Sequence, residues 1–165
     1  MDILVDPSGY LTFGELRYAC ALGRSGVGIK HAEGDGISPI GSYALGRVWW
    51  RADRLKCPET LLHTFEITEN TGWCDDPDHA DYNRLIALPH AARHERLWRA
   101  DHAYDVVVEV AFNSDPIEPG KGSAIFIHVA QPGYTPTEGC IALNVEDLLD
   151  ILRGADENTR LVIGA

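Results

Sequence analysis

The chain has 165 residues, of which 45% are hydrophobic and 24% are charged, a balance typical of a globular protein with a hydrophobic core. The formal net charge of −11 argues against nucleic acid as a partner and against electrostatic docking to an anionic membrane. There is no run of about 18 apolar residues, so no transmembrane segment is predicted.

The N-terminal part of the chain is predicted to form short strands separated by glycine-rich turns. In residues 15–22 the larger apolar residues recur at every second position, as in a half-buried strand. The stretches 23–28 and 34–41 lack the lysine and hydroxyl of a phosphate loop, so turns are predicted there. Further strands are predicted at residues 43–50, 63–68, 104–112, 123–130 and 160–164.

A polar loop at residues 73–83 is followed by a predicted mid-chain helix over His90–Arg99. His90 and His94 have the i, i+4 spacing of metal ligands on this helix. No further ligand completes a set, so we interpret them as part of a solvated helix face and predict no metal site.

A second helix is predicted after Asn144, which is a good N-cap residue. Leucine and isoleucine form its apolar stripe, and Gly154 suits its C-terminal end. The resulting order of elements predicts a single β-rich α+β domain over residues 1–165.

Four cysteines, Cys20, Cys57, Cys74 and Cys140, include no CxxC pair, which argues against a zinc ribbon or a thioredoxin motif. A disulfide between Cys57 and Cys74 stays open at this stage.

The most informative segment joins a histidine to a cysteine. His128 lies near the end of an apolar strand, and Cys140 follows Gly139 twelve residues later, shortly before the second helix. A helix N-terminus would stabilise a thiolate, a histidine would take the thiol proton, and a glycine turn would offer N–H groups to an oxyanion. The residue types alone leave open a structural cysteine beside a core histidine.

The same segment resembles the signature of the L,D-transpeptidase (YkuD-type) catalytic domain family. That signature is a histidine, a spacer, a hydroxyl residue, a variable residue, glycine and cysteine. Here these residues are His128, Thr137, Glu138, Gly139 and Cys140. The upstream stretch Ser38-Pro39-Ile40-Gly41-Ser42-Tyr43 fits the family's Thr/Ser-Pro-x-Gly-x-aromatic motif, and the resemblance covers about residues 14 to 165.

The resemblance is closest to the short proteobacterial branch, which has a Trp-x-Asp-Asp and a Tyr-Asn motif ahead of the core strands. The matching residues are Trp73, Asp75, Asp76, Tyr82 and Asn83. The resemblance implies a β-sandwich with a helix after the cysteine. It also implies Cys140 as nucleophile, His128 as base and the Val129 carbonyl as the group that orients the histidine. Gly139 would serve the oxyanion. Substrate contacts are implied for the motif residues, together with Tyr43, Thr137 and Glu138.

One departure concerns the donor site. The family commonly has an arginine two residues after the cysteine, where it binds a substrate carboxylate, but this chain has Ala142. Arg47, Arg51 and Lys30 are the candidates for a replacement charge.

The family resemblance implies a peptidoglycan L,D-transpeptidase without a cofactor. Its partners would be stem peptides of the meso-diaminopimelate type, joined by 3–3 or 1–3 links through a cysteine thioester, and a carbapenem would be a covalent inhibitor. Periplasmic localisation is expected from the family. Met1 to Asp6 lack the basic and apolar regions of a secretory signal peptide, which keeps the cytoplasm as the alternative.

Three other functions stay open. If water attacks the thioester, the enzyme is an L,D-carboxypeptidase or endopeptidase. A non-catalytic peptidoglycan-binding domain would keep the fold without needing a thiol. A cytoplasmic cysteine hydrolase would act on another peptide or amide. The sequence leaves the acyl donor, the acceptor and the oligomeric state undetermined.

Overall fold

The computed structural model of the protein describes residues 1–164, so residue 165 of the predicted domain lies outside the described part. Nearly all of its regular structure is β. The strands are β1 (Ile3–Asp6), β2 (Tyr10–Phe13), β3 (Leu16–Ala21), β4 (Val27–Gly28), β5 (Ser38–Pro39), β6 (Gly41–Trp50), β7 (Thr64–Glu66), β8 (Thr71–Cys74), β9 (Leu85–Ala87), β10 (His94–Arg96), β11 (Val106–Val110), β12 (Phe126–Val129), β13 (Ile141–Leu143) and β14 (Arg160–Ile163). The helical segments are a 3₁₀ turn, η1 (Pro132–Tyr134), and the helix α1 (Val145–Gly154).

The main sheet closes into a barrel. Its nine strands have the order β11-β12-β13-β3-β2-β1-β14-β6-β7, and β11 also pairs with β6. This extra pairing completes a ring to which β7 is added beside β6. The predicted β-sandwich is therefore replaced by a closed barrel, because β6 hydrogen-bonds to both β14 and β11 rather than leaving two open sheets.

Buried and exposed side chains alternate along the strands, and the buried ones fill the barrel interior. In β1, Ile3 and Val5 are buried whereas Leu4 between them is 41% exposed, as expected when successive side chains point to opposite faces. The strand predicted at residues 43–50 lies within β6, and the one predicted at residues 123–130 contains β12, so both predictions are confirmed. The β12 residues are all buried.

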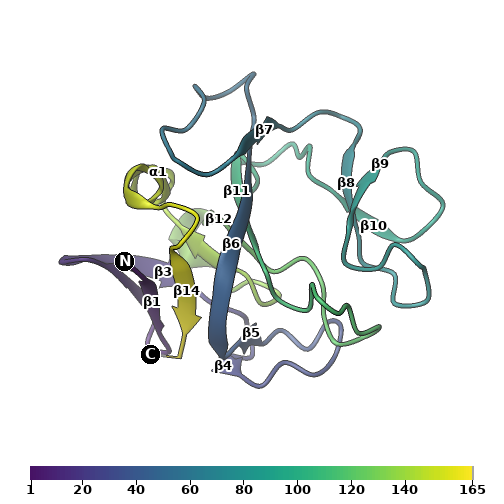
Figure 1. Ribbon diagram of the computed structural model, residues 1–165, viewed down its shortest axis with the longest axis horizontal. Coiled ribbons are helices and arrows are strands. Elements are labelled where there is room, and N and C mark those ends of the chain that lie inside the picture. The colour runs from purple at the N-terminus through teal and green to yellow at the C-terminus, as the bar shows by residue number, and fades with distance from the viewer. Residues whose placement is uncertain (165) are drawn as a thin grey trace.

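Helix α1 covers the barrel at one end and confirms the helix predicted after Asn144 (Figure 1). The Asn144 side chain accepts a hydrogen bond from the Glu146 N–H at 3.0 Å. The buried stripe consists of Leu148, Ile151 and Leu152. The helix ends at Gly154, where a Cβ would lie 2.8 Å from the Phe13 ring, so a larger residue would require this ring to shift.

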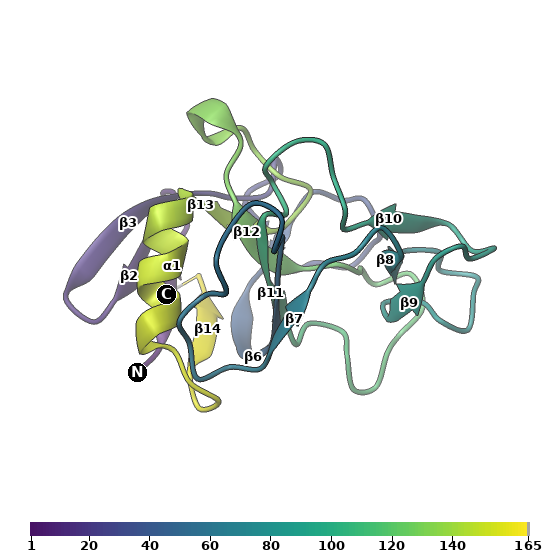
Figure 2. The same cartoon turned by 90° about the horizontal axis from the view of Figure 1, so that it is seen from above.

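A three-stranded sheet, β10-β8-β9, forms a lobe on the side opposite α1 (Figure 1, Figure 2). The helix predicted over His90–Arg99 is wrong, because this segment contains β10 and pairs with β8. Its two buried residues, Ala92 and Leu97, are five positions apart and form no helical stripe. The His90 Nδ1 also accepts the Ala92 N–H at 3.0 Å, a local bond that competes with helix formation.

The cysteines are separate from one another. Cys57 is exposed, whereas Cys74 is completely buried in the lobe, and both are free thiols. The Cys57–Cys74 disulfide considered above is therefore absent among the described residues. No helix in residues 1–164 has the length and apolar character needed to cross a membrane.

Candidate active site

A cleft of about 370 Å³ lies between the barrel and the lobe and contains both His128 and Cys140. His128 is on β12, and Cys140 immediately precedes β13. These strands are parallel neighbours, with His128 opposite Ala142 and Ile127 opposite Ile141. Strand pairing therefore brings a histidine and a cysteine that are distant in the chain to the same cleft.

The His128 ring is held by its own backbone. Its Nδ1 lies 2.9 Å from the Val129 carbonyl oxygen, which can only accept a hydrogen bond, so Nδ1 carries the hydrogen. The lone pair is then on Nε2, the nitrogen that a general base uses. Burial lowers the pKa of His128 below its usual 6.5, which keeps the imidazole neutral at pH 7.

The Cys140 thiol is buried between strands. It donates a hydrogen bond to the Ala124 carbonyl at 3.2 Å and accepts one from the Phe126 N–H at 3.4 Å. Burial raises the pKa of Cys140 to about 12, so the resting group is a neutral thiol rather than a thiolate. Because the thiol and the imidazole are both neutral, they do not form a thiolate–imidazolium ion pair at rest.

The expected helix N-terminus is not next to Cys140. Strand β13 lies between the cysteine and α1, which begins at Val145. Because the field of a helix dipole falls off within its first turn, α1 cannot account for thiolate stabilisation.

A network of hydrogen bonds positions the turn before Cys140. The Thr137 hydroxyl accepts the Gly139 N–H at 3.1 Å and donates to the Cys140 carbonyl at 2.7 Å. From the upstream motif, the Ser38 hydroxyl donates to the Gly139 carbonyl at 2.8 Å and accepts the Gly23 N–H at 2.9 Å. Thus Ser38, on β5 of the separate β4–β5 sheet, anchors the cysteine turn, a role that was not predicted from the sequence.

Gly139 itself satisfies two constraints. Its φ of +139° is rarely adopted by other residues, and an added Cβ would lie 2.7 Å from the Ile37 carbonyl oxygen. Because its N–H is already bonded to Thr137, it is less available to an oxyanion than the sequence predicted. Within residues 1–164, the Cys140 N–H has no hydrogen-bond partner and is the better candidate donor.

The comparison with protein families agrees with this arrangement. The model of the L,D-transpeptidase catalytic domain, YkuD, matches residues 2–163. The chain belongs to this family. No curated protein and no solved structure matches it. YkuD domains are typically cysteine-dependent enzymes and their substrate is peptidoglycan, so family membership supports L,D-transpeptidase-type activity at the family level.

Three residues from the motifs of the short proteobacterial branch, Trp73, Tyr82 and Asn83, lie behind the cleft wall rather than in it. The Trp73 indole N–H donates to the Asn83 Oδ1 at 3.0 Å, and the same oxygen accepts the Ala124 N–H at 3.0 Å. The Tyr82 hydroxyl accepts the Gly122 N–H at 2.9 Å. These contacts hold the segment that enters β12, and so support the backbone that contacts the Cys140 thiol.

Of the other residues with implied substrate contacts, Asp75, Thr137 and Glu138 line the cleft. Asp75 is paired with Arg93, and Glu138 is paired with Arg24, each at 3.1 Å.

Tyr43 and Asp76 are absent from the cleft lining. The Tyr43 hydroxyl donates to the Ile40 carbonyl at 2.8 Å. The Asp76 carboxylate accepts the Asp78 N–H at 3.1 Å, as in a local turn.

The charge that would replace the family arginine is not supplied by Arg47 or Arg51. Arg47 is bonded to Glu109 at 2.8 Å outside the cleft, and Arg51 is bonded to Asp53 at 2.8 Å. Lys30 lines the cleft, but its ammonium group is bonded to Asp35 at 2.6 Å. Arg99, which the sequence analysis did not name, also lines the cleft and is paired with Asp101 at 2.6 Å.

Several further polar residues of the cleft were not predicted from the sequence, among them Glu33, Glu95 and Tyr104. Glu33 accepts hydrogen bonds from the Ser123 hydroxyl at 3.0 Å and from Tyr82. Glu95 accepts one from the Tyr104 hydroxyl at 2.6 Å. No local pattern distinguishes these residues, because their partners come from distant parts of the chain.

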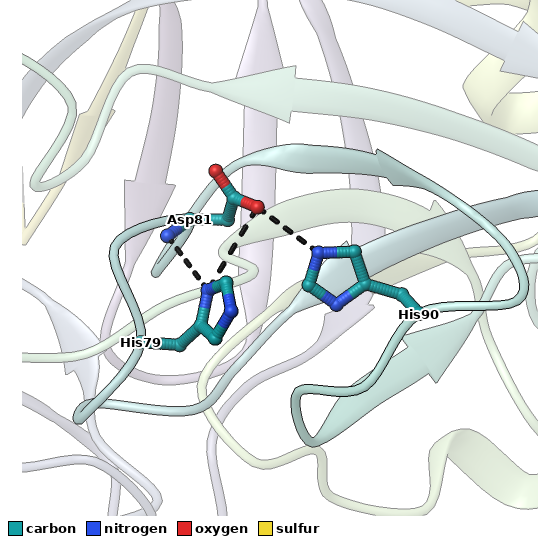
Figure 3. A group of neighbouring side chains, drawn as sticks. All are labelled: His79, Asp81 and His90. Carbon is teal, nitrogen blue, oxygen red and sulfur yellow. Dashed lines mark hydrogen bonds and ion pairs between the residues drawn. The ribbon is translucent and has the colours of Figure 1, made fainter.

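His79, Asp81 and His90 form a cluster in the lobe (Figure 3). The Asp81 N–H donates to the Nδ1 of His79, and the Ala92 N–H donates to the Nδ1 of His90, each at 3.0 Å. Both rings therefore carry their hydrogen on Nε2, and His90 donates it to the Asp81 carboxylate at 3.0 Å. These tautomers suit residues that hold the loop in place by hydrogen bonds better than a metal site, which needs free nitrogen lone pairs. His94, which has the i, i+4 spacing from His90 in the sequence, is on β10 and outside the cluster.

Proposed function

We propose that this protein is a peptidoglycan L,D-transpeptidase that works through a thioester at Cys140. The observation that carries the proposal is the hydrogen bond from His128 Nδ1 to Val129, which leaves Nε2 as a base in the cleft that holds the thiol. Family membership supports peptidoglycan as the substrate, and the donor proposed here is a stem peptide of the meso-diaminopimelate type.

In the first step the Cys140 sulfur attacks a peptide carbonyl of the donor as its proton passes to His128 Nε2. The Cys140 N–H stabilises the oxyanion that forms. Collapse of this intermediate breaks the C–N bond, and His128 returns the proton to the leaving amine. A thioester between donor and enzyme remains.

In the second step an amine of another stem peptide attacks the thioester, giving a 3–3 or 1–3 link. Attack by water instead gives the hydrolytic alternative, a carboxypeptidase or endopeptidase reaction. The buried, hydrogen-bonded thiol beside an oriented base favours catalysis over a purely peptidoglycan-binding domain.

The test incubates purified muropeptides with Cys140→Ala and His128→Gln proteins and follows products by mass spectrometry. Cys140→Ala is expected to abolish cross-linked product. His128→Gln is expected to lower the rate by about 10²–10⁴-fold, as is typical when a general base is removed. Replacement of the exposed Cys57 by alanine is the matched control and should leave the rate unchanged. Undiminished cross-linking by Cys140→Ala would contradict the proposal.

The pH dependence provides a second check. Because His128 acts as a neutral base and burial lowers its pKa, kcat/KM should fall only as the pH drops below 6.5. Carbapenem labelling of Cys140 should follow the same acid limb. An acid limb centred above pH 7 would contradict this assignment.

We also propose the periplasm as the place of action, because that is where stem peptides of the cell wall are cross-linked. Fractionation of cells that contain the native protein tests this, and recovery with cytoplasmic markers would favour a hydrolase acting on another amide.

A further inference from the structure

The Tyr104 hydroxyl and the Glu95 carboxylate form a pair in the cleft for which the mechanism above has no use. Tyr104 lies just before β11, and Glu95 is on β10 of the lobe. Both line the cleft with Cys140 and His128. The pair therefore joins the lobe to the barrel at the reacting groups.

The position of Tyr104 is fixed by packing. Its side chain is only 6% exposed, and its ring meets the His128 ring edge to face with 5.3 Å between centroids. The Phe126 ring, at 6.0 Å, packs against it as well. The phenol oxygen is thus held at one place beside the catalytic histidine.

The direction of the Tyr104 hydrogen is fixed by Glu95. The hydroxyl donates to Glu95 Oε1 at 2.6 Å, a length typical of an O–H bond to a carboxylate. Burial raises the pKa of Tyr104 well above 10, so the hydroxyl keeps this hydrogen. A phenol has one hydrogen and two lone pairs, so its oxygen can act toward the cleft only as an acceptor.

Among residues 1–164, no group donates a hydrogen bond to the Tyr104 oxygen. The Arg99 guanidinium lies over the Tyr104 ring, 5.0 Å from its centroid, and both cations of the cleft are paired with carboxylates. Lys30 is bonded to Asp35 at 2.6 Å, and Arg99 is bonded to Asp101 at 2.6 Å. An incoming N–H group would therefore find the Tyr104 oxygen available.

We propose that the Tyr104–Glu95 pair is the binding site for the amine that attacks the acyl-enzyme, with the phenol oxygen accepting one of its N–H hydrogen bonds. This inference rests on the proposed transpeptidase function and concerns its second step. Tyr104 would thereby favour cross-linking over hydrolysis.

The step balances without a further reactant. The free amine has lost any extra proton to solvent before it attacks. The amine nitrogen bonds to the thioester carbon, the C–S bond breaks, and one amine hydrogen passes through His128 Nε2 to the departing sulfur. The products are the new amide and the Cys140 thiol. Tyr104 accepts the hydrogen bond of the remaining N–H and keeps its own proton throughout.

The test compares Tyr104→Phe with the wild type, because phenylalanine keeps the ring against His128 and removes only the oxygen. Two quantities are measured: the rate of Cys140 acylation by a carbapenem, and the ratio of cross-linked to hydrolysed muropeptide over a range of acceptor concentrations. We expect acylation within about twofold of wild type and a ratio at least about tenfold lower, the effect of one lost hydrogen bond at a reacting group.

Two further variants guard against a structural effect. Glu95→Gln removes the carboxyl group but keeps an amide oxygen that can accept the Tyr104 hydrogen bond, so its ratio should fall by less than that of Tyr104→Phe. Tyr18→Phe is the matched control, because Tyr18 donates to Asp150 at 2.5 Å in a similar pair beside α1. Its ratio should not change.

The outcomes separate the two proposals. A wild-type protein that is not acylated at Cys140 overturns the proposed function itself. A protein that is acylated but yields only hydrolysed product overturns the amine site alone. Equal losses of acylation and cross-linking in Tyr104→Phe, or an unchanged ratio, would also overturn it.

Discussion

Different interactions stabilise the two ends of this molecule, the end covered by α1 and the end that contains the cleft. At the α1 end, Leu148, Ile151 and Leu152 are at most 2% exposed and pack against the barrel interior. At the cleft end, the cysteine turn is held by directional hydrogen bonds from Ser38 and Thr137. Hydrophobic packing tolerates small displacements, whereas a hydrogen-bonded turn places one sulfur atom accurately. Stability and catalytic geometry should therefore respond to different substitutions.

The strongest challenge to this comparison is Leu148→Ala. Leu148 lies on the buried face of α1 and is completely buried, so the substitution should lower the free energy of unfolding by about 2–5 kcal/mol through lost burial and a cavity. Urea unfolding measures this loss. The rate of carbapenem acylation, measured well below the melting temperature, should stay within about twofold. A large change in acylation would mean that the two ends are coupled.

Ser38→Ala tests the other end. It removes two buried hydrogen bonds, to the Gly139 carbonyl and from the Gly23 N–H, and should cost about 1–3 kcal/mol in the free energy of unfolding. Acylation should fall by about tenfold or more, because the Cys140 turn loses its anchor. The exposed Ser42 provides the control, and Ser42→Ala should preserve acylation. If Ser38→Ala lowered the free energy of unfolding but left the acylation rate unchanged, the anchor would be purely structural.

The contribution of Asp35 to stability at the cleft end should depend on pH. Burial acts to raise its pKa, but bonds from Lys30 and from the backbone N–H groups of Ile37, His31 and Ala32 lower it to about 2. A lowered pKa contributes stability that is present above the unfolded value of 3.8 and is lost as the pH falls toward 2.

Replacing Asp35 with asparagine should therefore cost about 1 kcal/mol at pH 6, a value that allows for screening by solvent. This difference from wild type should shrink between pH 4 and pH 2. Urea unfolding at several pH values checks both statements, and a difference independent of pH would show that Asp35 acts through its shape rather than its charge.

Local patterns predicted those parts of the fold that depend on local periodicity. The helix after Asn144 and the strand regions at β3, β6, β11 and β12 are confirmed, since each carries its own apolar pattern. The segment His90–Arg99 was mispredicted because its structure depends on pairing with β8, about twenty residues earlier. Closure of the barrel likewise depends on a distant pairing, that of β11 with β6.

The site divides in the same way. His128 and Cys140 were predicted as a pair, and the structure places both in one cleft. The contributions of Ser38, Glu95 and Tyr104 could not be predicted, because each depends on a partner supplied by another strand or turn.

The sheet order has a consequence for biosynthesis. Among the described strands β14 comes last in sequence, yet it lies between β1 and β6, so the ring stays open until Arg160–Ile163 have left the ribosome. Until then the edges of β1 and β6 offer unpaired backbone groups to other nascent chains. Contacts between such distant residues also form slowly during folding. Emergence of β14 from the ribosome, rather than synthesis of Cys140, should thus set the earliest moment at which the cleft becomes reactive.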